Sequence, residues 1–484
     1  MLFNSLDFAI FLPVVFILYW FVFNRNLKHQ NLLVAVSSYV FYGWWDYRFL
    51  SLIIFSTILD YWIGRGIVHT SLPKQKKILL WISIIINLGF LGIFKYYNFF
   101  IDNFRSAFSF LGYEINTNSL NIILPVGISF YTFQTLSYSI DVYKGNLKPT
   151  NDFIKFAAFV SFFPQLVAGP IERATNLLPQ FYKRRRFSYE NSVNGLRQIL
   201  WGLFKKVVIA DNCAVYANYI FENSLELPGS TLFIGALLFT IQIYCDFSGY
   251  SDIAIGTSRL FGFNLMKNFA FPYFSRDIAE FWRRWHISLS TWFRDYLYIP
   301  LGGSKGGVLI KIRNTFIIFI VSGFWHGANW TFIVWGTLNA IYFLPLLLSN
   351  KNRNNLGIVA ENNNMPSLKE LFQMLGTFLL TIFAWIFFRA ESLNHAISYI
   401  GEILSWSLFN PPSSLDVIGL KKILIFLIVL FFMIEWFGRK GDYALDNIIF
   451  LKSKLVRWGF YSFIVFLIGM FMYTEKTNFI YFQF

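Results

Sequence analysis

The chain has 484 residues, of which 56% are hydrophobic, 21% are aromatic and only 14% are charged, and phenylalanine alone accounts for 60. This composition excludes an ordinary soluble globular protein. A formal net charge of +15 would favour a nucleic-acid partner in a soluble chain. Here the basic residues cluster beside apolar stretches, so no nucleic-acid partner is expected.

Apolar stretches of membrane-spanning length, roughly 20 residues, recur along the whole chain. The first, Leu6–Phe23, lacks the basic start and small-residue cleavage site of a signal peptide, so it is expected to be a retained anchor. The other predicted segments are 31–45, 49–68, 78–98, 120–140, 153–168, 192–222, 231–260, 308–322, 328–349, 371–388, 421–437 and 456–473. The sequence therefore predicts an all-α polytopic integral membrane protein with a single membrane domain, 1–484.

Several of these segments are interrupted. Lys205 and Lys206 lie in the middle of 192–222, and Gly323, Gly327 and Pro345 interrupt the apolar run around His326. Broken or re-entrant helices are expected there, because irregular backbone at membrane depth must be buried in protein or line a cavity. The longest polar connection, Asn350–Pro366, is predicted to be an exposed loop.

Basic clusters lie at Lys74–Lys77, Lys183–Arg186, Lys305–Arg313 and Lys452–Arg457. They fit short cytoplasmic loops that obey the positive-inside rule and contact anionic headgroups. An alternative for part of them is an anionic cytoplasmic substrate such as coenzyme A, because Arg and Lys pair with phosphates. The two cysteines, Cys213 and Cys245, fall in apolar segments, so neither a disulfide framework nor a metal site is expected.

His326 lies between Arg313 and Lys351, in a stretch that contains no Asp, Glu, Lys or Arg. An ionisable group at membrane depth usually faces a bundle interior or a wet cavity and marks chemistry or transport. A general base near neutral pH is one such use; a neutral histidine that links two helices is the structural alternative. Gly323 and Gly327 permit close approach around it, and the amide of Asn329 could orient a ring or a substrate.

Between 261 and 313 aromatic and charged residues alternate too densely for a span, so interfacial helices are predicted. In helical register, Trp282, His286 and Ser290 would share one face. His286 would then point at whatever that face covers; the alternative is an anchor helix with a structural histidine.

A second polar group, Tyr244–Asp252, lies within an apolar segment and contains Asp246 and Asp252. These carboxylates could orient a histidine, pair with Arg283 or Arg284, or line a cavity, and pairing between helices is favoured. The segment Phe162–Arg173 ends an apolar stretch with Pro and Gly and is interpreted as a structural bend.

The chain has no Gly-x-Ser-x-Gly elbow, no His-Glu-x-x-His pair, no phosphate-binding Gly-rich loop and no Rossmann fingerprint. Acyl transfer from a thioester to a hydroxyl needs little more than a base and donors for the oxyanion. His326 could be that base. Ser288, Ser290 and Ser322 are weak candidates for a covalent acyl carrier.

Five motifs in order resemble the membrane-bound O-acyltransferase (MBOAT) superfamily, and within it the bacterial branch of the alginate O-acetyltransferase membrane subunit. They are Leu124–Gln134, Tyr244–Asp252, Arg284–Tyr296, Ser322–Trp330 and Trp385–Ala390. The resemblance implies a ring of about 11 to 13 transmembrane or re-entrant helices around a central tunnel, with interfacial helices. We expect the core at about 120–400, N-terminal spans in 1–119 and C-terminal spans in 420–475.

The resemblance also implies functional roles. His326 matches the family's catalytic histidine and His286 a second active-site position; further expected lining residues are Asp246, Arg284, Ser290, Trp325 and Asn329. No bound cofactor or metal is expected. Acetyl-CoA would be the cytoplasmic acyl donor, a polysaccharide the extracytoplasmic acceptor, and a periplasmic serine esterase-like acetyltransferase the partner. The expected location is the plasma membrane, which is the inner membrane in a Gram-negative cell.

Two alternatives remain open at this point. A sister branch of the family transfers D-alanine to teichoic acids from an acylated carrier protein. A transporter or flippase could also line its path with His and Asp, although no internal inverted repeat is evident.

Overall fold

The computed structural model describes residues 1–113, 120, 123–167, 169–412, 422–446 and 453–472. Parts of four predicted segments, residues 121–122, 168, 421 and 473, lie outside the described residues, as do 420, 474 and 475. No β-strand occurs in the described ranges, and 7 of their helices are long and apolar enough to cross a membrane. These helices are Tyr47–His69, Pro73–Phe110, Gly229–Leu260, Val308–His326, Trp330–Leu348, Leu368–Arg389 and Lys454–Phe471. The predicted all-α polytopic membrane fold is confirmed, whereas the ring, the tunnel and the single-domain division stay predictions.

The helices group into two compact units, which are described separately. The first unit comprises Met1–Gly195 and Thr257–Met266. Its elements are α1 (Leu6–Ile17), η1 (Leu18–Val22), α2 (Leu27–Gly43), η2 (Tyr47–Phe49), α3 (Leu50–His69), α4 (Pro73–Leu91), η3 (Gly92–Tyr96), α5 (Tyr97–Phe110), α6 (Ile128–Lys144), α7 (Phe153–Val160), α8 (Phe163–Leu166), α9 (Ala174–Leu177) and η4 (Leu178–Tyr182).

The second unit comprises Leu196–Gly256 and Lys267–Phe484. Its elements are η5 (Phe204–Ala210), α11 (Asp211–Glu222), η6 (Pro272–Phe274), α13 (Ile278–Arg284), α14 (Ile287–Phe293), η7 (Arg294–Tyr298), α15 (Val308–His326), α16 (Trp330–Leu348), α17 (Leu368–Arg389), α18 (Leu393–Ile403), η8 (Trp406–Phe409), α20 (Lys422–Gly438) and α21 (Lys454–Phe471). Two long helices, α10 (Tyr189–Leu203) and α12 (Gly229–Leu260), contribute residues to both units.

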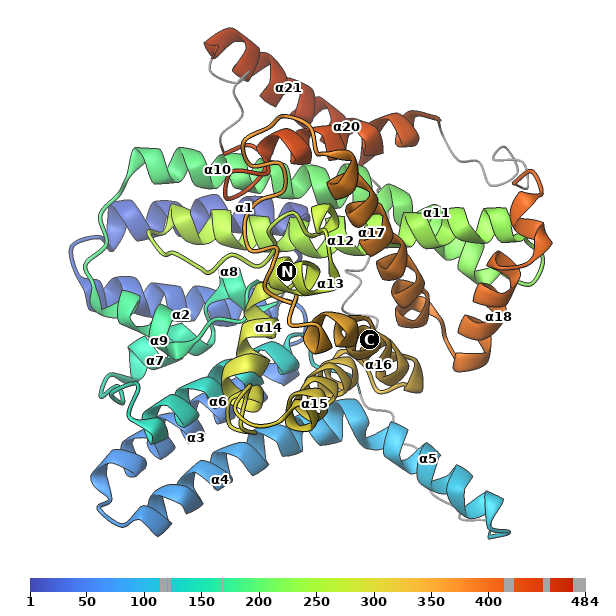
Figure 1. Ribbon diagram of the computed structural model, residues 1–484. Coiled ribbons are helices and arrows are strands. Elements are labelled where there is room, and N and C mark those ends of the chain that lie inside the picture. The colour runs from blue at the N-terminus through green and yellow to red at the C-terminus, as the bar shows by residue number, and fades with distance from the viewer. Residues whose placement is uncertain (114–119, 121–122, 168, 413–421, 447–452, 473–484) are drawn as a thin grey trace. The chain divides into compact units, whose positions relative to one another are not determined.

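A buried polar cluster joins α3, α4 and α6 of the first unit, which lie side by side in Figure 1. The carboxylate of Asp60, which has no exposed surface, accepts hydrogen bonds from Ser83 Oγ at 2.5 Å and Ser139 Oγ at 2.7 Å. Asn87 Nδ2 donates to the other carboxylate oxygen at 2.8 Å. A buried carboxylate is tolerable when its lone pairs are satisfied in this way. These hydrogen bonds thus fix the three helices against one another.

In the second unit, buried carboxylates are stabilised by ion pairs instead of by neutral hydrogen-bond donors. Lys206 Nζ lies 2.7 Å from both Asp211 and Asp246, and Lys205 Nζ lies 2.6 Å from Asp252. These pairs join η5 to α12, so the favoured role of Asp246 and Asp252 in pairing helices is confirmed. Pairing of Asp246 with Arg283 or Arg284 is wrong, because buried carboxylates pair with the nearest buried cations, here the lysines of the π-helical segment.

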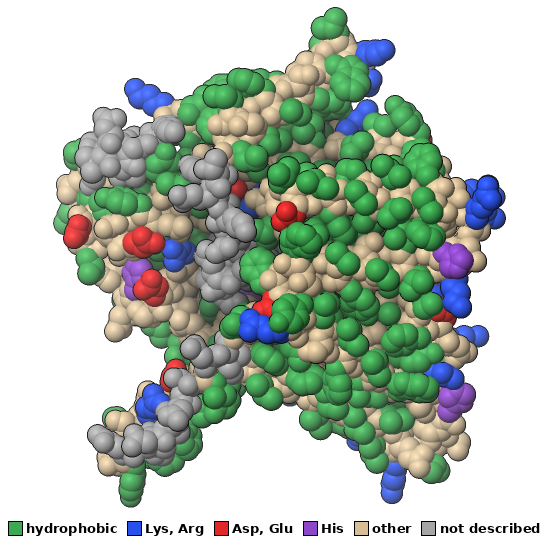
Figure 2. Space-filling view, turned by 180° about the vertical axis from the view of Figure 1, so that it is seen from behind, with side chains coloured by type: hydrophobic (Ala, Val, Ile, Leu, Met, Phe, Trp, Pro, Cys, Tyr) green, Lys and Arg blue, Asp and Glu red, His purple; other side chains and the backbone are tan. Residues whose placement is uncertain are grey.

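Hydrophobic side chains dominate the face drawn in Figure 2. Large apolar residues are exposed along several predicted spans, for example Phe372 at 72% and Ile85 at 64%. An apolar surface of this kind suits contact with lipid rather than water.

Candidate active site

The two predicted histidines lie close together in the second unit. His326 is the last residue of α15, and His286 immediately precedes α14. Their side chains are almost completely buried, at 4% and 1% exposure, and their ring centroids are 6.5 Å apart. Trp325 lies beside both, with ring centroids 5.0 Å from His326 and 6.1 Å from His286. The structure therefore brings these three predicted site residues together.

The wall around His326 is aromatic. Trp335 of α16 and Phe388 of α17 each place a ring centroid 5.2 Å from the imidazole, with the planes near perpendicular. Both rings are at most 1% exposed. A low-polarity wall strengthens any electrostatic interaction made inside the site.

Glycines set the close packing of α15 against α16 that places His326. A Cβ on Gly323 would lie 2.2 Å from the carbonyl oxygen of Phe332, and one on Gly336 would lie 2.2 Å from that of Phe319. The two antiparallel helices therefore approach closer than side chains would allow (Figure 1). The close approach expected from Gly323 is confirmed, and Gly327 likewise abuts the Phe332 ring.

The predicted continuous helix through Trp282, His286 and Ser290 is wrong. α13 ends at Arg284, Trp285 is extended, and His286 has a left-handed backbone with φ 42° and ψ 54°. Two backbone hydrogen bonds hold this corner: Ala270 N donates to Arg284 O and Ile287 N donates to Asn268 O, each at 2.9 Å. A non-glycine residue in this conformation is held there only by its surroundings, and such residues cluster at functional sites.

Asn268 fixes the tautomer of His286. The Asn268 Oδ1 atom accepts the backbone N–H of Ser288 at 3.3 Å, so this oxygen must be the acceptor end of the amide. His286 Nδ1 lies 3.1 Å from the same oxygen and must therefore carry its proton. Asn268 Nδ2 completes the arrangement by donating to Ser251 Oγ at 3.1 Å.

The other ring nitrogen of His286, Nε2, consequently carries a lone pair and can only accept a hydrogen bond. His286 Nε2 is buried and has no hydrogen-bond partner among the described residues. Burial lowers the pKa of His286 to about 3, so the ring is neutral at physiological pH. A buried acceptor without a donor is costly in a folded protein, so Nε2 is free to accept a hydrogen bond from a ligand bound beside the ring.

A pocket of about 510 Å³ reaches the layer of residues next to the histidines. Its described lining residues are Trp282, Ser290, Phe293, Arg294, Tyr298, Ser304, Lys311, Thr315, Ile318, Phe319, Ser322, Phe343, Leu347, Asn350, Asn352 and Arg353. Neither histidine is among them. Ser322 lies one turn before His326 on α15, and Ser290 lies one turn after His286, so the lining includes a residue one turn from each histidine.

Three cations line this pocket, Arg294, Lys311 and Arg353, of which Arg294 is paired with Asp295 at 2.6 Å. No Asp or Glu is among its described lining residues. A ligand with a negatively charged part and an uncharged part would match this lining, since guanidinium and ammonium groups pair with phosphates.

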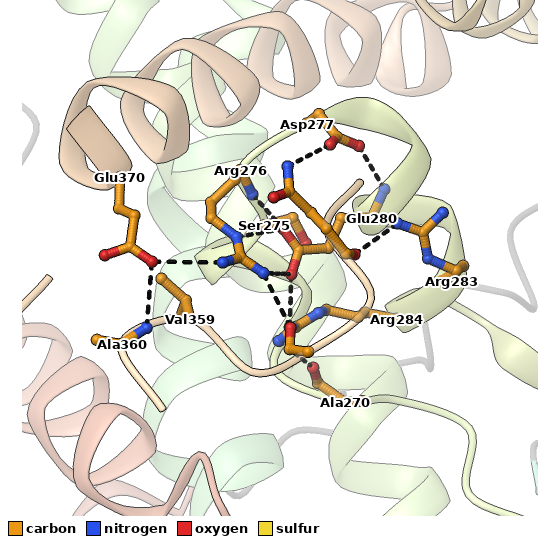
Figure 3. A network of polar contacts seen from close by, with 12 residues as sticks. Ala270, Ser275, Arg276, Asp277, Glu280, Arg283, Arg284, Val359, Ala360 and Glu370 are labelled. Atoms are coloured by element: carbon orange, nitrogen blue, oxygen red, sulfur yellow. Dashed lines mark hydrogen bonds and ion pairs between the residues drawn. The ribbon is translucent and has the colours of Figure 1, made fainter. Parts of the chain in front are cut away.

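An arginine network holds the loop that follows α16. Figure 3 shows Arg276 between Glu280 and Glu370, with Glu280 also held by Arg284. Arg276 Nη2 and Arg284 Nη2 lie 3.0 and 2.6 Å from Glu280 Oε1, and both guanidiniums donate to Gly357 O. Arg284 thus anchors the backbone of a loop, and it is not among the described lining residues of the pocket.

The same loop is held at two further places. Arg283 donates to the carbonyl oxygens of Asn352 and Asn355 at 2.8 and 2.7 Å, and Arg439 donates to that of Val359 at 3.0 Å. Most of the predicted loop Asn350–Pro366 is exposed, as expected, but Val359 is fully buried. Because Asn352 lines the pocket, its contact with Arg283 holds part of the pocket wall in place.

The remaining predicted site residues have mixed outcomes. Ser290 lines the pocket, and its Oγ lies 3.4 Å from the carbonyl oxygen of Trp285. Asn329 instead caps α16: its Oδ1 accepts from Thr331 N at 3.0 Å and its Nδ2 donates to Glu391 O at 3.0 Å. Asp246 lies in the ion-pair network with Lys206 described above.

Sequence reasoning missed Asn268, Glu280 and the pocket cations as a group. Asn268 lies in the irregular stretch after α12, where no periodicity marks it. Glu280 was visible as an (i, i+4) neighbour of both Arg276 and Arg284, a spacing that favours ion pairs on a helix.

Comparison with known proteins identifies the family of the chain. The family model described as "MBOAT, membrane-bound O-acyltransferase family" matches residues 150–382. A probable alginate O-acetylase AlgI of Pseudomonas syringae pv. tomato is 40% identical over 453 residues, which are 92% of this chain and 83% of that protein. A peptidoglycan O-acetyltransferase of Helicobacter pylori is 37% identical over 83% of this chain and 79% of its own length.

A teichoic acid D-alanyltransferase of Bacillus subtilis is 29% identical over 235 residues, or 46% of this chain and 58% of that protein. The similarity to the two O-acetyltransferases extends over far more of the chain. With the extent of these matches, the chain belongs to the membrane-bound O-acyltransferase family and is an O-acyltransferase of the membrane.

Proposed function

We propose that this protein takes an acetyl group from acetyl-CoA on the cytoplasmic side and passes it across the plasma membrane for O-acetylation of an extracytoplasmic polysaccharide. A periplasmic serine esterase-like acetyltransferase would complete the transfer. In a Gram-negative cell the membrane would be the inner one.

The observation that carries this proposal is the position of the pocket beside the histidine pair. Its cations, Lys311 among them, suit the phosphates of coenzyme A. Ser322, another lining residue, is one helical turn from His326. A thioester held by its phosphates would therefore have its acyl end near the imidazoles.

In the reaction, a hydroxyl oxygen of the acceptor forms a bond to the acetyl carbonyl carbon and the C–S bond breaks. His326 takes the hydroxyl proton as general base and then gives it to the departing thiolate, which leaves as the free thiol. His286 is neutral with a lone pair on Nε2, so it accepts a hydrogen bond from the acceptor hydroxyl or from protonated His326 and orients the reacting groups.

The polysaccharide acceptor and the partner rest on the relatives. Those with the broadest coverage are named as acetylases of alginate or peptidoglycan, both of which are polymers outside the cytoplasm. The acceptor is therefore proposed as an exopolysaccharide or cell-wall glycan, and a soluble partner is proposed because a polymer is large compared with a buried histidine pair.

The test is thiol release from acetyl-CoA by the purified full chain in detergent or nanodiscs, with and without a candidate partner. His326→Gln should abolish thiol release while the unfolding temperature of the protein stays at the wild-type value. His395→Gln is the matched control. His395 lies on α18, its Nε2 is 3.1 Å from Ser224 Oγ, and it is not among the described lining residues of the pocket. Release that survives in His326→Gln contradicts the role of His326.

The donor is tested in the same assay with a D-alanyl carrier protein. Turnover of that donor but not of acetyl-CoA would replace the proposed reaction by D-alanyl transfer. Solute movement without consumption of either thioester would favour a transporter.

A further inference from the structure

The first unit contains a second basic pocket, independent of the histidines. Its volume is about 610 Å³, and its described lining residues are Phe16, Trp20, Phe21, Asn24, Arg25, Arg184, Arg185, Arg186 and Phe187. We call this pocket the arginine groove. It combines four guanidiniums with aromatic rings, and no Asp or Glu is among its described lining residues.

Arg185 is built into the floor of the arginine groove. It is only 7% exposed, and its Nη2 donates to Asn31 Oδ1 at 2.6 Å. Its guanidinium carbon lies 4.7 Å from the ring centroid of Phe263 and 5.6 Å from that of Tyr19. Cation–π contacts of this kind hold a guanidinium in a defined place.

The charge of Arg185 lacks a carboxylate partner in the described part of the groove. Its Nε atom is buried without a hydrogen-bond partner there, and burial lowers the pKa of Arg185. A buried cation is unfavourable without an anion. Arg25, Arg184 and Arg186 are exposed around it, so an anion in the groove would be reached from several directions.

An apolar strip leads away from the groove along α1 and η1. Ile10, Val14, Ile17 and Phe21 are 60%, 51%, 53% and 76% exposed and recur at helical spacing. From Ile10 to Phe21 the strip spans roughly 16 Å, about half of the ~30 Å hydrocarbon core. That length matches the acyl chains of one leaflet.

The aromatic residues at the end of the strip are fixed by hydrogen bonds within the first unit. Trp20 Nε1 donates to Leu260 O at 2.9 Å, and Tyr19 OH donates to Phe261 O at 3.0 Å. Tryptophan and tyrosine favour the level of the lipid headgroups. The groove therefore lies where the strip meets the headgroup layer.

We propose that the arginine groove binds one anionic phospholipid, with its phosphodiester on Arg185 and the three exposed arginines and its acyl chains on the strip of α1. Coenzyme A also carries phosphates, but it has no acyl chains long enough for the strip. The groove is thus assigned to a lipid and is separate from the proposed donor pocket of the second unit.

The test is native mass spectrometry of the full chain released from nanodiscs that contain phosphatidylglycerol and phosphatidylcholine of equal acyl length. The variant is Arg25→Gln/Arg184→Gln/Arg186→Gln. The matched control is Lys74→Gln/Lys76→Gln/Lys77→Gln, which removes the same charge from the basic start of α4. We expect the groove variant to retain at least about tenfold less phosphatidylglycerol and the control to retain as much as the wild type.

Equal loss in both variants would mean nonspecific attraction to an anionic surface and would overturn the proposal, as would equal binding of the two lipids by the wild type. Displacement of the lipid by coenzyme A or by inorganic phosphate alone would also overturn it. If the triple variant does not fold, Arg25→Gln serves in its place, because Arg25 is exposed. The count of bound lipid does not depend on acetyl transfer.

Discussion

Replacing Asn268 by leucine tests how His286 is held. The change keeps the size of the side chain but removes the oxygen that accepts from His286 Nδ1 and from the backbone and side chain of Ser288, at 3.1, 3.3 and 2.8 Å. A buried donor left unsatisfied costs about 1–3 kcal/mol. If a cost of this size is added to the activation free energy because His286 is misoriented, the rate falls about 5-fold to 150-fold.

The assay is thiol release at saturating acetyl-CoA, together with the unfolding temperature in detergent. Asn268→Leu should lower kcat by that factor with little effect on KM, because the variant misorients the His286 ring but does not weaken binding of acetyl-CoA. Ser251→Ala is the graded control. It removes only the acceptor of Asn268 Nδ2 and leaves the contacts of Oδ1, so its kcat should stay within a few-fold of the wild type.

A pH profile separates orientation from simple destabilisation. The pKa of His286 is about 3 in the wild type because of burial, so its Nε2 stays a lone pair across the physiological range. Asn268→Asp would place a carboxylate beside Nδ1, which favours the imidazolium and raises this pKa. The variant should therefore lose activity on the acid side at a higher pH than the wild type.

Two results would refute this reasoning. One is a folded Asn268→Leu protein with wild-type kcat; the other is an Asn268→Asp protein with an unshifted acid limb. Either would mean that the tautomer of His286 does not matter for turnover.

Three further predictions concern packing and the donor. Lys206→Met should lower the free energy of unfolding by about 3–5 kcal/mol, because it leaves two buried carboxylates without their cation; thermal unfolding measures this. Gly323→Ala should destabilise the protein by about 1–3 kcal/mol and reduce activity, because its Cβ would meet a backbone oxygen of α16, whereas Gly376→Ala, with nothing within 4 Å, should not. Lys311→Gln and Arg353→Gln should each raise the KM for acetyl-CoA about tenfold with kcat nearly unchanged, as initial-rate kinetics will show.

Controls sharpen these three tests. Adding Asp246→Asn to Lys206→Met should recover part of the lost stability, and a wild-type unfolding temperature in the single variant would contradict the ion-pair account. Acetyl-phosphopantetheine, which lacks the nucleotide phosphates, should show no KM difference in the Lys311 and Arg353 variants. An equal rise for both donors would mean that these cations do not recognise the nucleotide part.

Local patterns in the sequence were enough for the helices and the membrane setting, and they singled out His326 as a candidate. Apolar stretches of spanning length need no knowledge of the fold, because lipid imposes the same requirement on each helix separately. The glycines at 323 and 327 likewise predicted close packing near His326, since a residue without a side chain lets a neighbouring backbone approach.

The tertiary structure decided which groups meet. His286 was expected on a continuous helix, yet pairing of its backbone with the stretch around Asn268 turns the chain at a left-handed residue. Asp246 was expected to pair helices, with Arg283 or Arg284 among its possible partners, yet Lys206 is its partner. Such contacts join residues far apart in the chain, and they depend on burial and on competition between partners, which helical periodicity does not encode.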